Sequence, residues 1–573
     1  MLKASVLFIS ALLVANVATG QAPQSNPVSI SVDLAKPVGS YKPITSWFGY
    51  DESNYTTMKY GRQLLGELHD LSPAPVYIRT HHLLTSGNGV PELKWSSSNV
   101  FSLDKDGKPV YDFTITDQTF DAFEKAGVRP MVELGFMPRD LAAPIPGITE
   151  YQLHYPKPTM GGASNNPPSD YKMWGELVRK YTEHLVQRYG RQQVSTWYFE
   201  VWNEPDILYW HGTPQDYFKL YDYAVAGVRA ALPDARVGGP ATTGPGNAKA
   251  SAFLESFLEH CMHDKSAADG KPIPLDFISF HPKGRTTFVG GGVMMGLSNE
   301  LQAAQAGFKI VAKYPQYRQL PIILSEADPE GCAACSMKDN PANAYRNGPL
   351  YAAYTAAAIK ALFELQDANK VNLIAMLSWS FEFEGKDYFE GFRTLSTNGI
   401  DKPILNLFRI TGLMSGDRVE TTSTGATPID ELVKAGARQT PDPKAPDIDV
   451  FATKADREAA VMVWNYHDDD LPAPTTDIQV TIAGIPAGIK RVLLEHYRID
   501  ETHSNAYTTW KNMGSPQSPT PDQYAQLKAA GQLQLLNSPT WLDVDEGKVI
   551  PEGKVIIDAS LPRQAVSLLL LKW

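Results

Sequence analysis

The chain has 573 residues and a formal net charge of −11, and 43% of its residues are hydrophobic. This length is enough for two or three domains, and the apolar content is enough for a substantial core. The acidic balance, without a basic cluster, argues against nucleic acid and anionic membrane surfaces as partners.

The N-terminus reads as a secretory signal peptide over residues 1–20. Lys3 provides the positive start, an apolar run extends from Val6 to Val17, and small residues at 18–20 suit cleavage. A membrane anchor is the alternative, but the run is too short to span a bilayer comfortably. We therefore expect a secreted or periplasmic protein that has no membrane association after cleavage.

Eight short runs rich in β-branched and aromatic residues follow, each bounded by turn or helix signals. They cover residues 44–50, 75–81, 129–136, 197–203, 235–241, 276–282, 321–327 and 373–381. Helical patterns separate most of them, including 171–190, 213–233 and 342–365. Strands that are apolar on both faces and alternate with helices predict a (β/α)8 barrel over residues 28–425. A doubly wound open sheet is the alternative, but it would favour a Gly-rich phosphate loop after the first strand, which the sequence lacks.

From residue 426 to residue 573 the pattern changes to the alternation typical of an antiparallel β-sandwich. Residues 447–467 read as a hairpin, and residues 477–499 and 553–573 alternate in the same way. A polar helical insert at 518–532 interrupts the strands. An N-terminal strand near residues 28–35 can pair with this domain.

Two of the three cysteines are close in sequence, at Cys332 and Cys335. In an oxidising compartment this pair can close a tight disulfide, which we predict, and free thiols are the alternative. A zinc site needs about four ligands. No second cysteine pair or nearby histidine pair completes one, so we predict no metal site.

Polar and aromatic residues gather where the predicted barrel strands end, which is where such barrels carry their functional groups. They are Tyr50, Asp51, Glu52, Arg79, His81, His82, Glu133, Asn203, Glu204, His281, Lys283, Glu326, Asp328, Trp379, Glu382 and Glu384. The set lacks a nucleophilic serine with a base, a phosphate loop and clear metal spacing. Acids with aromatic platforms suit a sugar, because carboxylates accept hydroxyl protons and aromatic faces cover the C–H side of the ring. Glu133 and Glu200 lie within or near their strands, and we expect them to pair with Arg79 inside the barrel.

Two carboxylates carry glycoside hydrolysis, one as acid/base and one as nucleophile. Glu204 ends the fourth strand in WYFEVWNEPD, and Glu326 closes the apolar run PIILS. Their strands lie nearly opposite across the barrel mouth, which can bring the two acids within about 5–5.5 Å, the separation found in retaining enzymes. We predict that Glu204 is the acid/base, that Glu326 attacks C1, and that Asn203 binds the sugar 2-hydroxyl. This chemistry needs no cofactor.

The segment FEVWNEPD resembles the acid/base motif of glycoside hydrolase family 39, and other segments extend the resemblance over most of the chain. They are FGYDESNYT (48–56), YIRTHHLL (77–84), ELGFMPRDLA (133–142), LPDARVGGP (232–240), ISFHPKG (278–284), SEADP (325–329) and YRIDETHSNAYTTW (497–510). The resemblance implies a retaining exo-glycosidase with Glu204 as acid/base and Glu326 as nucleophile. It also implies a sugar subsite lined by His81, Asn203, His281, Trp379 and Glu382.

The family contains β-xylosidases and α-L-iduronidases, and the motifs of this chain are mixed. RTHHLL, HPKG and EADP look like the iduronidase branch, in which Lys283, and similarly Arg393, would face a carboxylate. LSWSFEFEG (377–385) looks like the xylosidase branch, in which Trp379, Glu382 and Glu384 would bind the sugar. We expect a β-D-xylosidase acting on xylo-oligosaccharides. A uronate- or arabinose-acting exo-glycosidase and a non-catalytic carbohydrate-binding protein are the alternatives, and the oligomeric state is left open.

Overall fold

The computed structural model describes residues 26–148, 151, 162–289, 292–434, 446–546 and 553–573. The predicted signal peptide at 1–20 lies outside these residues. No helix within the described part of the chain is long and apolar enough to cross a membrane.

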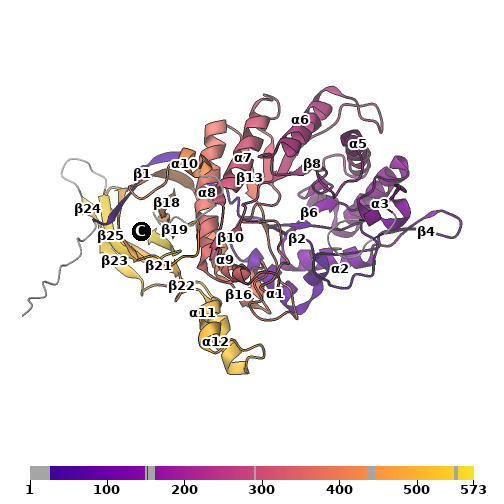
Figure 1. The fold of residues 1–573 in the computed structure, drawn as a ribbon. Coiled ribbons are helices and arrows are strands. Elements are labelled where there is room, and N and C mark those ends of the chain that lie inside the picture. The colour runs from indigo at the N-terminus through magenta and orange to yellow at the C-terminus, as the bar shows by residue number, and fades with distance from the viewer. Residues whose placement is uncertain (1–25, 149–150, 152–161, 290–291, 435–445, 547–552) are drawn as a thin grey trace, which may run out of the picture.

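A parallel barrel forms the larger part of the molecule (Figure 1). Its strands are β2 (Trp47–Tyr50), β3 (Tyr77–Thr80), β6 (Arg129–Leu134), β7 (Tyr198–Val201), β8 (Arg236–Thr243), β9 (Phe277–His281), β12 (Pro321–Leu324) and β13 (Asn372–Met376). Each strand pairs in parallel with the next. The short β14 (Ser378–Trp379) continues β13 and pairs with β2, which closes the barrel. Each strand overlaps a predicted run, with β8 ending two residues later and β13 beginning one residue earlier than predicted. The predicted (β/α)8 barrel is therefore confirmed and the open sheet is excluded.

Helices cover the outside of the barrel. They are α1 (Lys59–His69), α2 (Thr114–Ala126), α3 (Tyr171–Tyr189), α5 (Pro214–Ala231), α6 (Ala248–His263), α7 (Leu297–Ala312), α8 (Pro349–Asn369) and α9 (Pro403–Gly412). Local sequence sets their ends: Thr213 and Asp216 form a reciprocal capping box at the start of α5. The helix expected from residue 342 begins at Pro349 instead, because a separate 3-10 turn precedes it and proline is favoured at the first helical position.

Shorter elements fill the connections. They are α4 (Arg191–Val194), α10 (Ile429–Lys434), η1 (Ser53–Thr57), η2 (Arg139–Leu141), η3 (Gly162–Asn165), η4 (Pro341–Asn347), β4 (Phe101–Leu103), β5 (Pro109–Tyr111), β10 (Thr287–Val289), β11 (Gly292–Met294), β15 (Ser396–Thr397) and β16 (Ile400–Asp401). The strands among them form three two-stranded hairpins.

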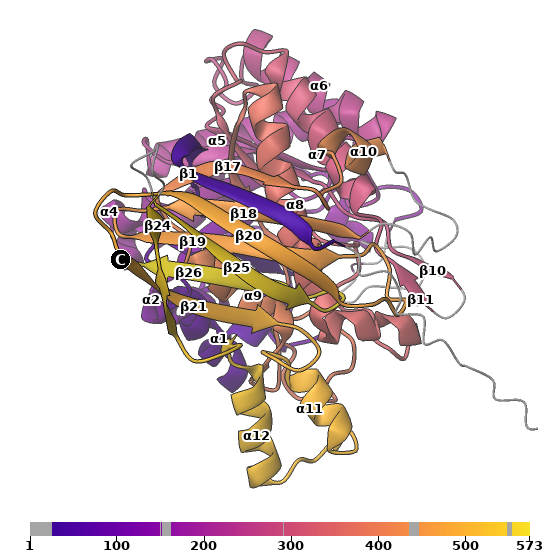
Figure 2. The same ribbon diagram turned by 90° about the vertical axis from the view of Figure 1, so that its left-hand side faces the viewer.

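A second sheet, with 11 strands against the 9 of the barrel in the described part of the chain, packs beside the barrel. Figure 2 views this sheet from its outer side. Its strands are β1 (Val28–Ser40), β17 (Asp417–Ser423), β18 (Asp447–Lys454), β19 (Glu458–Tyr466), β20 (Thr476–Ile485), β21 (Arg491–Ile499), β22 (Gln534–Leu535), β23 (Thr540–Asp543), β24 (Asp545–Glu546), β25 (Gly553–Leu561) and β26 (Val566–Lys572). The order along the path is β22-β21-β26-β19-β18-β17-β1-β20-β25-β24. All pairs are antiparallel except that of β1 with β20.

The predicted antiparallel region is therefore present as one continuous sheet that curves around a shared apolar core. That core contains side chains from strands near both ends of the path, including Val492 on β21 and Val555 on β25. The N-terminal strand β1 pairs with both β17 and β20. The domain limits at 425 and 426 stay predictions, although β17 already belongs to this sheet.

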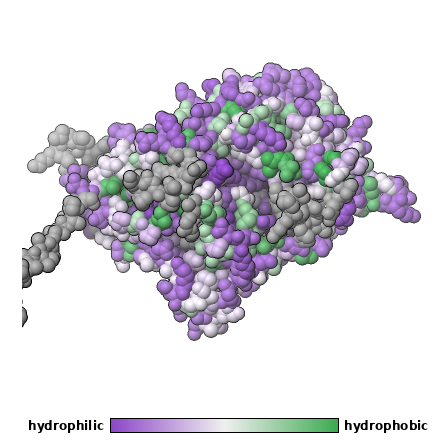
Figure 3. Space-filling model, viewed as in Figure 1, coloured by the Kyte–Doolittle hydropathy of each residue, from purple (hydrophilic) through white to green (hydrophobic). Residues whose placement is uncertain are grey.

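Helix α8 joins the barrel to the second sheet. Its side chains are buried on nearly every face. On the sheet side the Phe363 ring stacks on Phe451 of β18 at 5.4 Å between centroids. The helical insert α11 (Ala506–Asn512) and α12 (Pro521–Gly531) projects at the lower edge of Figure 1 and packs on the barrel loops through Phe389 and Ile400. On the face shown in Figure 3, hydrophilic residues dominate and apolar residues form small separate groups.

Candidate active site

A pocket of about 460 Å³ lies at the C-terminal ends of the barrel strands. Most of the predicted substrate residues line it. The lining includes Asp51, His81, Asn203, Glu204, Tyr209, His281, Lys283, Arg285, Glu326 and Trp379. These side chains come from six different strand ends, as expected for a site built on a barrel of this type.

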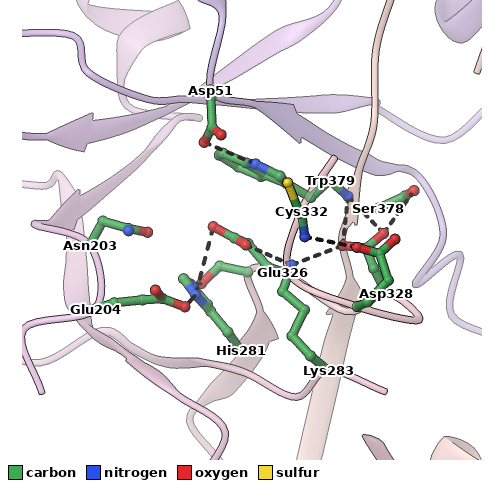
Figure 4. A network of polar contacts seen from close by, with 12 residues as sticks. Asp51, Asn203, Glu204, His281, Lys283, Glu326, Asp328, Cys332, Ser378 and Trp379 are labelled. Carbon is green, nitrogen blue, oxygen red and sulfur yellow. Dashed lines mark hydrogen bonds and ion pairs between the residues drawn. The ribbon is translucent and has the colours of Figure 1, made fainter. Parts of the chain in front are cut away.

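The two predicted catalytic acids meet around one histidine (Figure 4). One side-chain atom from each of Glu204, His281 and Glu326 lies within 4.8 Å of the other two. His281 Nδ1 lies 2.9 Å from Glu204 Oε1 and 3.7 Å from Glu326 Oε1. Its Nε2 lies 3.1 Å from the Ser325 hydroxyl, which fixes the ring between the acids.

Glu204 is held in an uncommon backbone conformation. Its φ is 47°, in the left-handed region that non-glycine residues seldom occupy. The backbone N–H of Glu204 donates to the Ala241 carbonyl at 2.8 Å, which ties this turn to β8. Conformations of this kind persist where the surrounding structure imposes them, and they cluster at functional sites.

Glu326 is surrounded by cations. Lys283 Nζ lies 2.6 Å from Glu326 Oε2, and Arg79 donates to Oε1 at 3.2 Å. Burial alone would raise the pKa of Glu326, but the charges of Lys283, His281 and Arg79 outweigh it and lower that pKa below its ordinary value. Glu326 is therefore ionised over a wide pH range, as a carboxylate nucleophile must be.

Arg79 connects the site to the barrel interior. Its guanidinium lies 2.5 Å from Glu200, 2.9 Å from Glu133 and 2.9 Å from the Asn203 side-chain oxygen. All of these side chains are buried. The ion pairs expected from Arg79 to Glu133 and Glu200 are present, and the same group orients Asn203 beside Glu204.

His81 and Trp379 occupy the other side of the pocket. His81 Nδ1 lies 2.6 Å from Glu133, and His81 Nε2 lies 3.5 Å from Asp51 Oδ1. The indole N–H of Trp379 donates to the same Asp51 oxygen at 3.1 Å. Gly49 allows this arrangement, since a Cβ there would lie 2.4 Å from the Trp379 ring.

Lys283 sits between two carboxylates. Besides Glu326 it pairs with Asp328 at 3.1 Å. Asp328 also accepts a hydrogen bond from the backbone N–H of Trp379 at 3.1 Å. Burial would lower the pKa of Lys283, but Glu326 and Asp328 raise it above its ordinary value, so the amine remains protonated.

The structure does not bring Glu382 and Glu384 to the pocket, contrary to the expected substrate contacts. Glu382 is fully buried and accepts hydrogen bonds from the Asn398 backbone at 2.6 Å and from the Ser396 hydroxyl. Burial raises the pKa of Glu382 to about 7. Glu384 accepts a hydrogen bond from the Tyr60 backbone at 2.8 Å. Both acids follow β14, where the chain leaves the barrel and the strand no longer determines the direction of the side chains.

Arg393 is also absent from the pocket lining. It is fully buried and pairs with Glu330 at 2.9 Å and Asp328 at 3.5 Å. It also donates to the Trp379 carbonyl at 3.3 Å. Arg393 thus holds the loops behind the site and does not face a substrate carboxylate.

A disulfide joins Cys332 to Cys335 in the loop that follows Glu326. The backbone N–H of Cys332 donates to Glu330 at 2.8 Å, and the neighbouring Gly331 lines the pocket. The disulfide therefore braces one wall of the site. Cys261 is buried in the barrel core.

Two clusters of acid and imidazole groups have their atoms within the range of metal ligands. They are Asp51 with His81 and His82, and Glu204 with His281 and Glu326. In the second cluster Lys283 and Arg79 already place positive charge on Glu326, which disfavours a further cation. The absence of a cofactor stays a prediction.

Asp51 is one of the pocket residues to which the sequence assigned no role. Its position at the end of the first strand was the sequence feature that pointed to the pocket. Glu52 follows at the same strand end, but it is buried and accepts a hydrogen bond from the Lys94 backbone at 2.7 Å. Strand position alone does not distinguish the two. Tyr209, from the loop after Glu204, was missed because no strand end predicts it.

Known proteins resemble this chain in sequence and in fold. Residues 74–538 match the Glycosyl hydrolases family 39. The β-xylosidase of Caldicellulosiruptor saccharolyticus is 28% identical over 445 residues, which cover 75% of this chain and 78% of that protein. The α-L-iduronidase of Mus musculus is 26% identical over 384 residues, which cover 62% of this chain and 56% of that protein.

A similar fold occurs in the crystal structure of a monomeric β-xylosidase from Caulobacter crescentus, with a TM-score of 0.71 and 21% sequence identity. The similarity covers 95% of this chain and 99% of that one. Because the family match spans most of the sequence and the acids meet in the pocket that the barrel provides, the chain belongs to glycosyl hydrolase family 39 and is a glycoside hydrolase.

Proposed function

We propose that this enzyme is a retaining, exo-acting β-D-xylosidase that removes terminal xylose from xylo-oligosaccharides by double displacement. The observation that carries the proposal is the approach of Glu204 and Glu326. One carboxylate oxygen of each lies within 4.8 Å of the other, beside His281. Retaining glycosidases place their two carboxyl groups about 5–5.5 Å apart, whereas inverting enzymes need roughly 6.5–9.5 Å to admit a water molecule.

In the first step Glu326 attacks C1 of the terminal sugar. A bond forms between a Glu326 oxygen and C1, the bond from C1 to the leaving oxygen breaks, and Glu204 transfers its proton to that oxygen. Lys283 and Arg79 keep Glu326 ionised before the attack. Asn203, oriented by Arg79, is placed to bind the 2-hydroxyl.

In the second step Glu204 acts as a base. It takes a proton from water as the water oxygen attacks C1, and the bond from C1 to Glu326 breaks. The sugar leaves with its original anomeric configuration, Glu204 is protonated again, and Glu326 is again a carboxylate. His281, 2.9 Å from Glu204, positions that acid through both steps.

Xylose is the proposed sugar because the β-xylosidase relative matches along more of its length than the iduronidase relative does. A uronate-acting glycosidase is the second candidate, because Lys283 and the exposed Arg285 both line the pocket. Lys283 is already paired with two carboxylates, which weakens its attraction for a third. We also propose that the enzyme is secreted or periplasmic, because the sequence predicts a signal peptide over residues 1–20.

A panel of aryl glycosides tests the proposal. The parent enzyme should hydrolyse 4-nitrophenyl β-D-xyloside in preference to β-D-glucoside, α-L-arabinoside and an α-L-iduronide, and NMR of the first product should show the β-anomer. Glu326→Gln should abolish turnover. The matched control Glu384→Gln changes the same functional group outside the pocket and should leave kcat/KM near the parent value. Turnover of the iduronide alone would refute the xylosidase assignment, and an α-xylose product would refute retention.

A further inference from the structure

We propose that Asp51 is a substrate-binding residue that accepts hydrogen bonds from hydroxyl groups on the part of the sugar ring farthest from C1. This inference rests on the proposed glycosidase function and names the residue that holds the other end of the same sugar. Three features of the site carry it: the oxygen of Asp51 to which no described residue donates, the place of Asp51 opposite the acid/base, and the rigidity of its supports.

The first feature is a carboxylate oxygen that accepts no hydrogen bond from the described part of the chain. Asp51 lines the pocket, and its side chain is only 17% exposed. Trp379 Nε1 and His81 Nε2 both approach Oδ1, at 3.1 and 3.5 Å. No donor from the residues that the structure describes reaches Oδ2. A carboxylate has about four lone-pair sites, so Oδ2 keeps acceptor capacity for a ligand that enters the pocket.

The second feature is position. Figure 4 shows Asp51 and Trp379 on one side of Glu326, and Glu204 and His281 on the other. C1 must lie against Glu326 with the leaving oxygen towards Glu204, since those groups form and break its bonds. The ring carbons that follow C1 therefore extend towards Asp51. Hydroxyls at C3 and C4 are the donors that a pyranose presents at that end.

The third feature is a rigid support. The Trp379 indole that binds Asp51 is itself fixed, because its backbone N–H donates to Asp328 and its ring lies against Gly49. His81, the other neighbour of Asp51, is held by Glu133 at 2.6 Å. An acceptor held in place before the sugar arrives loses little entropy on binding, which is how binding groups contribute most to turnover.

The remaining carboxylates of the pocket cannot take this role. Among the lining residues that the structure describes, the acids are Asp51, Glu204 and Glu326, and the last two are committed to C1. Glu382 and Glu384, the acids expected to bind the sugar, have protein partners elsewhere. Burial raises the pKa of Asp51, although the charge of His81 acts in the opposite direction. Hydrogen bonds donated by sugar hydroxyls would favour the ionised form of Asp51 and so oppose the effect of burial.

Deoxy substrates combined with variants at this position test the inference. The substrates are 4-nitrophenyl β-D-xyloside and its 3-deoxy and 4-deoxy analogues, and the measurement is kcat/KM. Removing the hydroxyl that Asp51 binds should lower kcat/KM of the parent by about 10- to 100-fold, the size of a hydrogen bond to a charged group. Asp51→Ala should lower it by a similar factor on the full xyloside, with no further loss on that deoxy analogue.

Asp51→Asn is the second variant, because its side-chain oxygen can still accept from Trp379 Nε1 and so keeps the local structure. It should show the same non-additive pattern with a smaller loss, since neutral hydrogen bonds are roughly half as strong as charged ones. The control Glu384→Gln should show losses on deoxy sugars equal to those of the parent.

The failures of the two proposals can be told apart. If the parent enzyme turns over the xyloside, and the losses from Asp51→Asn and from each deoxy sugar simply multiply, Asp51 does not bind a hydroxyl and the inference is overturned. If the parent does not hydrolyse the xyloside, the proposed function is overturned and this inference with it.

Discussion

Replacing Arg79 with methionine removes one cation from three buried carboxylates. Arg79 contacts Glu133, Glu200 and Glu326 at 2.5–3.2 Å, and its own side chain is 0% exposed. Methionine fills similar space but leaves the acids without their shared partner. Breaking a buried ion pair in this way costs roughly 3–5 kcal/mol.

That cost converts into a shift of the melting temperature. Unfolding entropy is about 2.1 cal/mol/K per residue, so a barrel of roughly 400 residues has about 0.8 kcal/mol/K. A destabilisation of about 4 kcal/mol then lowers the melting temperature by about 5 °C. The variant should also lose turnover, because Arg79 orients Asn203 and Glu326.

The loss of stability depends on pH, and its sign follows from Glu326. The pKa of Glu326 is lowered in the folded protein, so its ionisation stabilises the fold above the unfolded pKa of about 4.3 and this stability is lost as the pH falls through the folded value. Without Arg79 that contribution shrinks. The difference in melting temperature between parent and variant should therefore be larger at pH 7 than at pH 4.

Differential scanning calorimetry at several pH values measures both effects. Arg129→Met is a matched control, since Arg129 lies at the start of β6 and its side chain donates to the Tyr77 hydroxyl at 3.3 Å and lies over that ring, away from the three acids. It should melt within about 1 °C of the parent, as substitutions outside buried networks cost little. An Arg79→Met variant that melts with this control would refute the assignment of Arg79 as the buried partner of three acids.

Three further substitutions probe the acid/base, the cation beside the nucleophile and the buried support of the site. Glu204→Gln should lower kcat/KM on xylo-oligosaccharides by roughly 10²–10⁴-fold, the usual contribution of general acid catalysis. The loss should be far smaller on a dinitrophenyl xyloside, because its leaving group needs no proton. Equal losses on both substrates would contradict the role of Glu204. Lys283→Met removes the cation 2.6 Å from Glu326 and should raise the pKa of Glu326. The acidic limb of the pH profile of kcat/KM should therefore move to higher pH. An unmoved limb would contradict the role of Lys283 in keeping Glu326 ionised. Arg393→Met breaks buried pairs with Glu330 and Asp328 and should cost roughly 3–5 kcal/mol in chemical denaturation, whereas parent-like stability would contradict the buried role.

The barrel could be predicted from the sequence because its strands are short, buried on both faces and separated by helices. Glu204 directly follows the run that ends at Asn203, and Glu326 lies next to the end of the run that ends at Ala327. The C-terminal ends of barrel strands meet at one mouth, so these two side chains are brought together there. Glu204 and Glu326 are therefore brought together by rules that act along each strand. The same rules account for the positions of His81 and His281.

The rest of the site depends on loops that such rules do not reach. After Trp379 the chain leaves the barrel, so nothing in the spacing of Glu382 and Glu384 shows that one turns towards Ser396 and the other towards Tyr60. Arg393 lies in the same region and pairs with acids from another loop. The sequence indicated an N-terminal strand near residues 28–35 that can pair with the second domain, but it did not indicate which strands this one joins. That order depends on contacts between β1 and β17, which lie nearly 400 residues apart in the chain.

The double displacement requires a covalent bond between the sugar and Glu326. Incubation with 2-deoxy-2-fluoro-β-D-xylosyl fluoride, followed by proteolysis and tandem mass spectrometry, shows which residue carries the sugar. The mechanism predicts one fluoroxylosyl group on Glu326, in the peptide that contains Ser325, and none in Glu326→Gln. A label on another residue, or loss of fluoride with no labelled peptide, would contradict it.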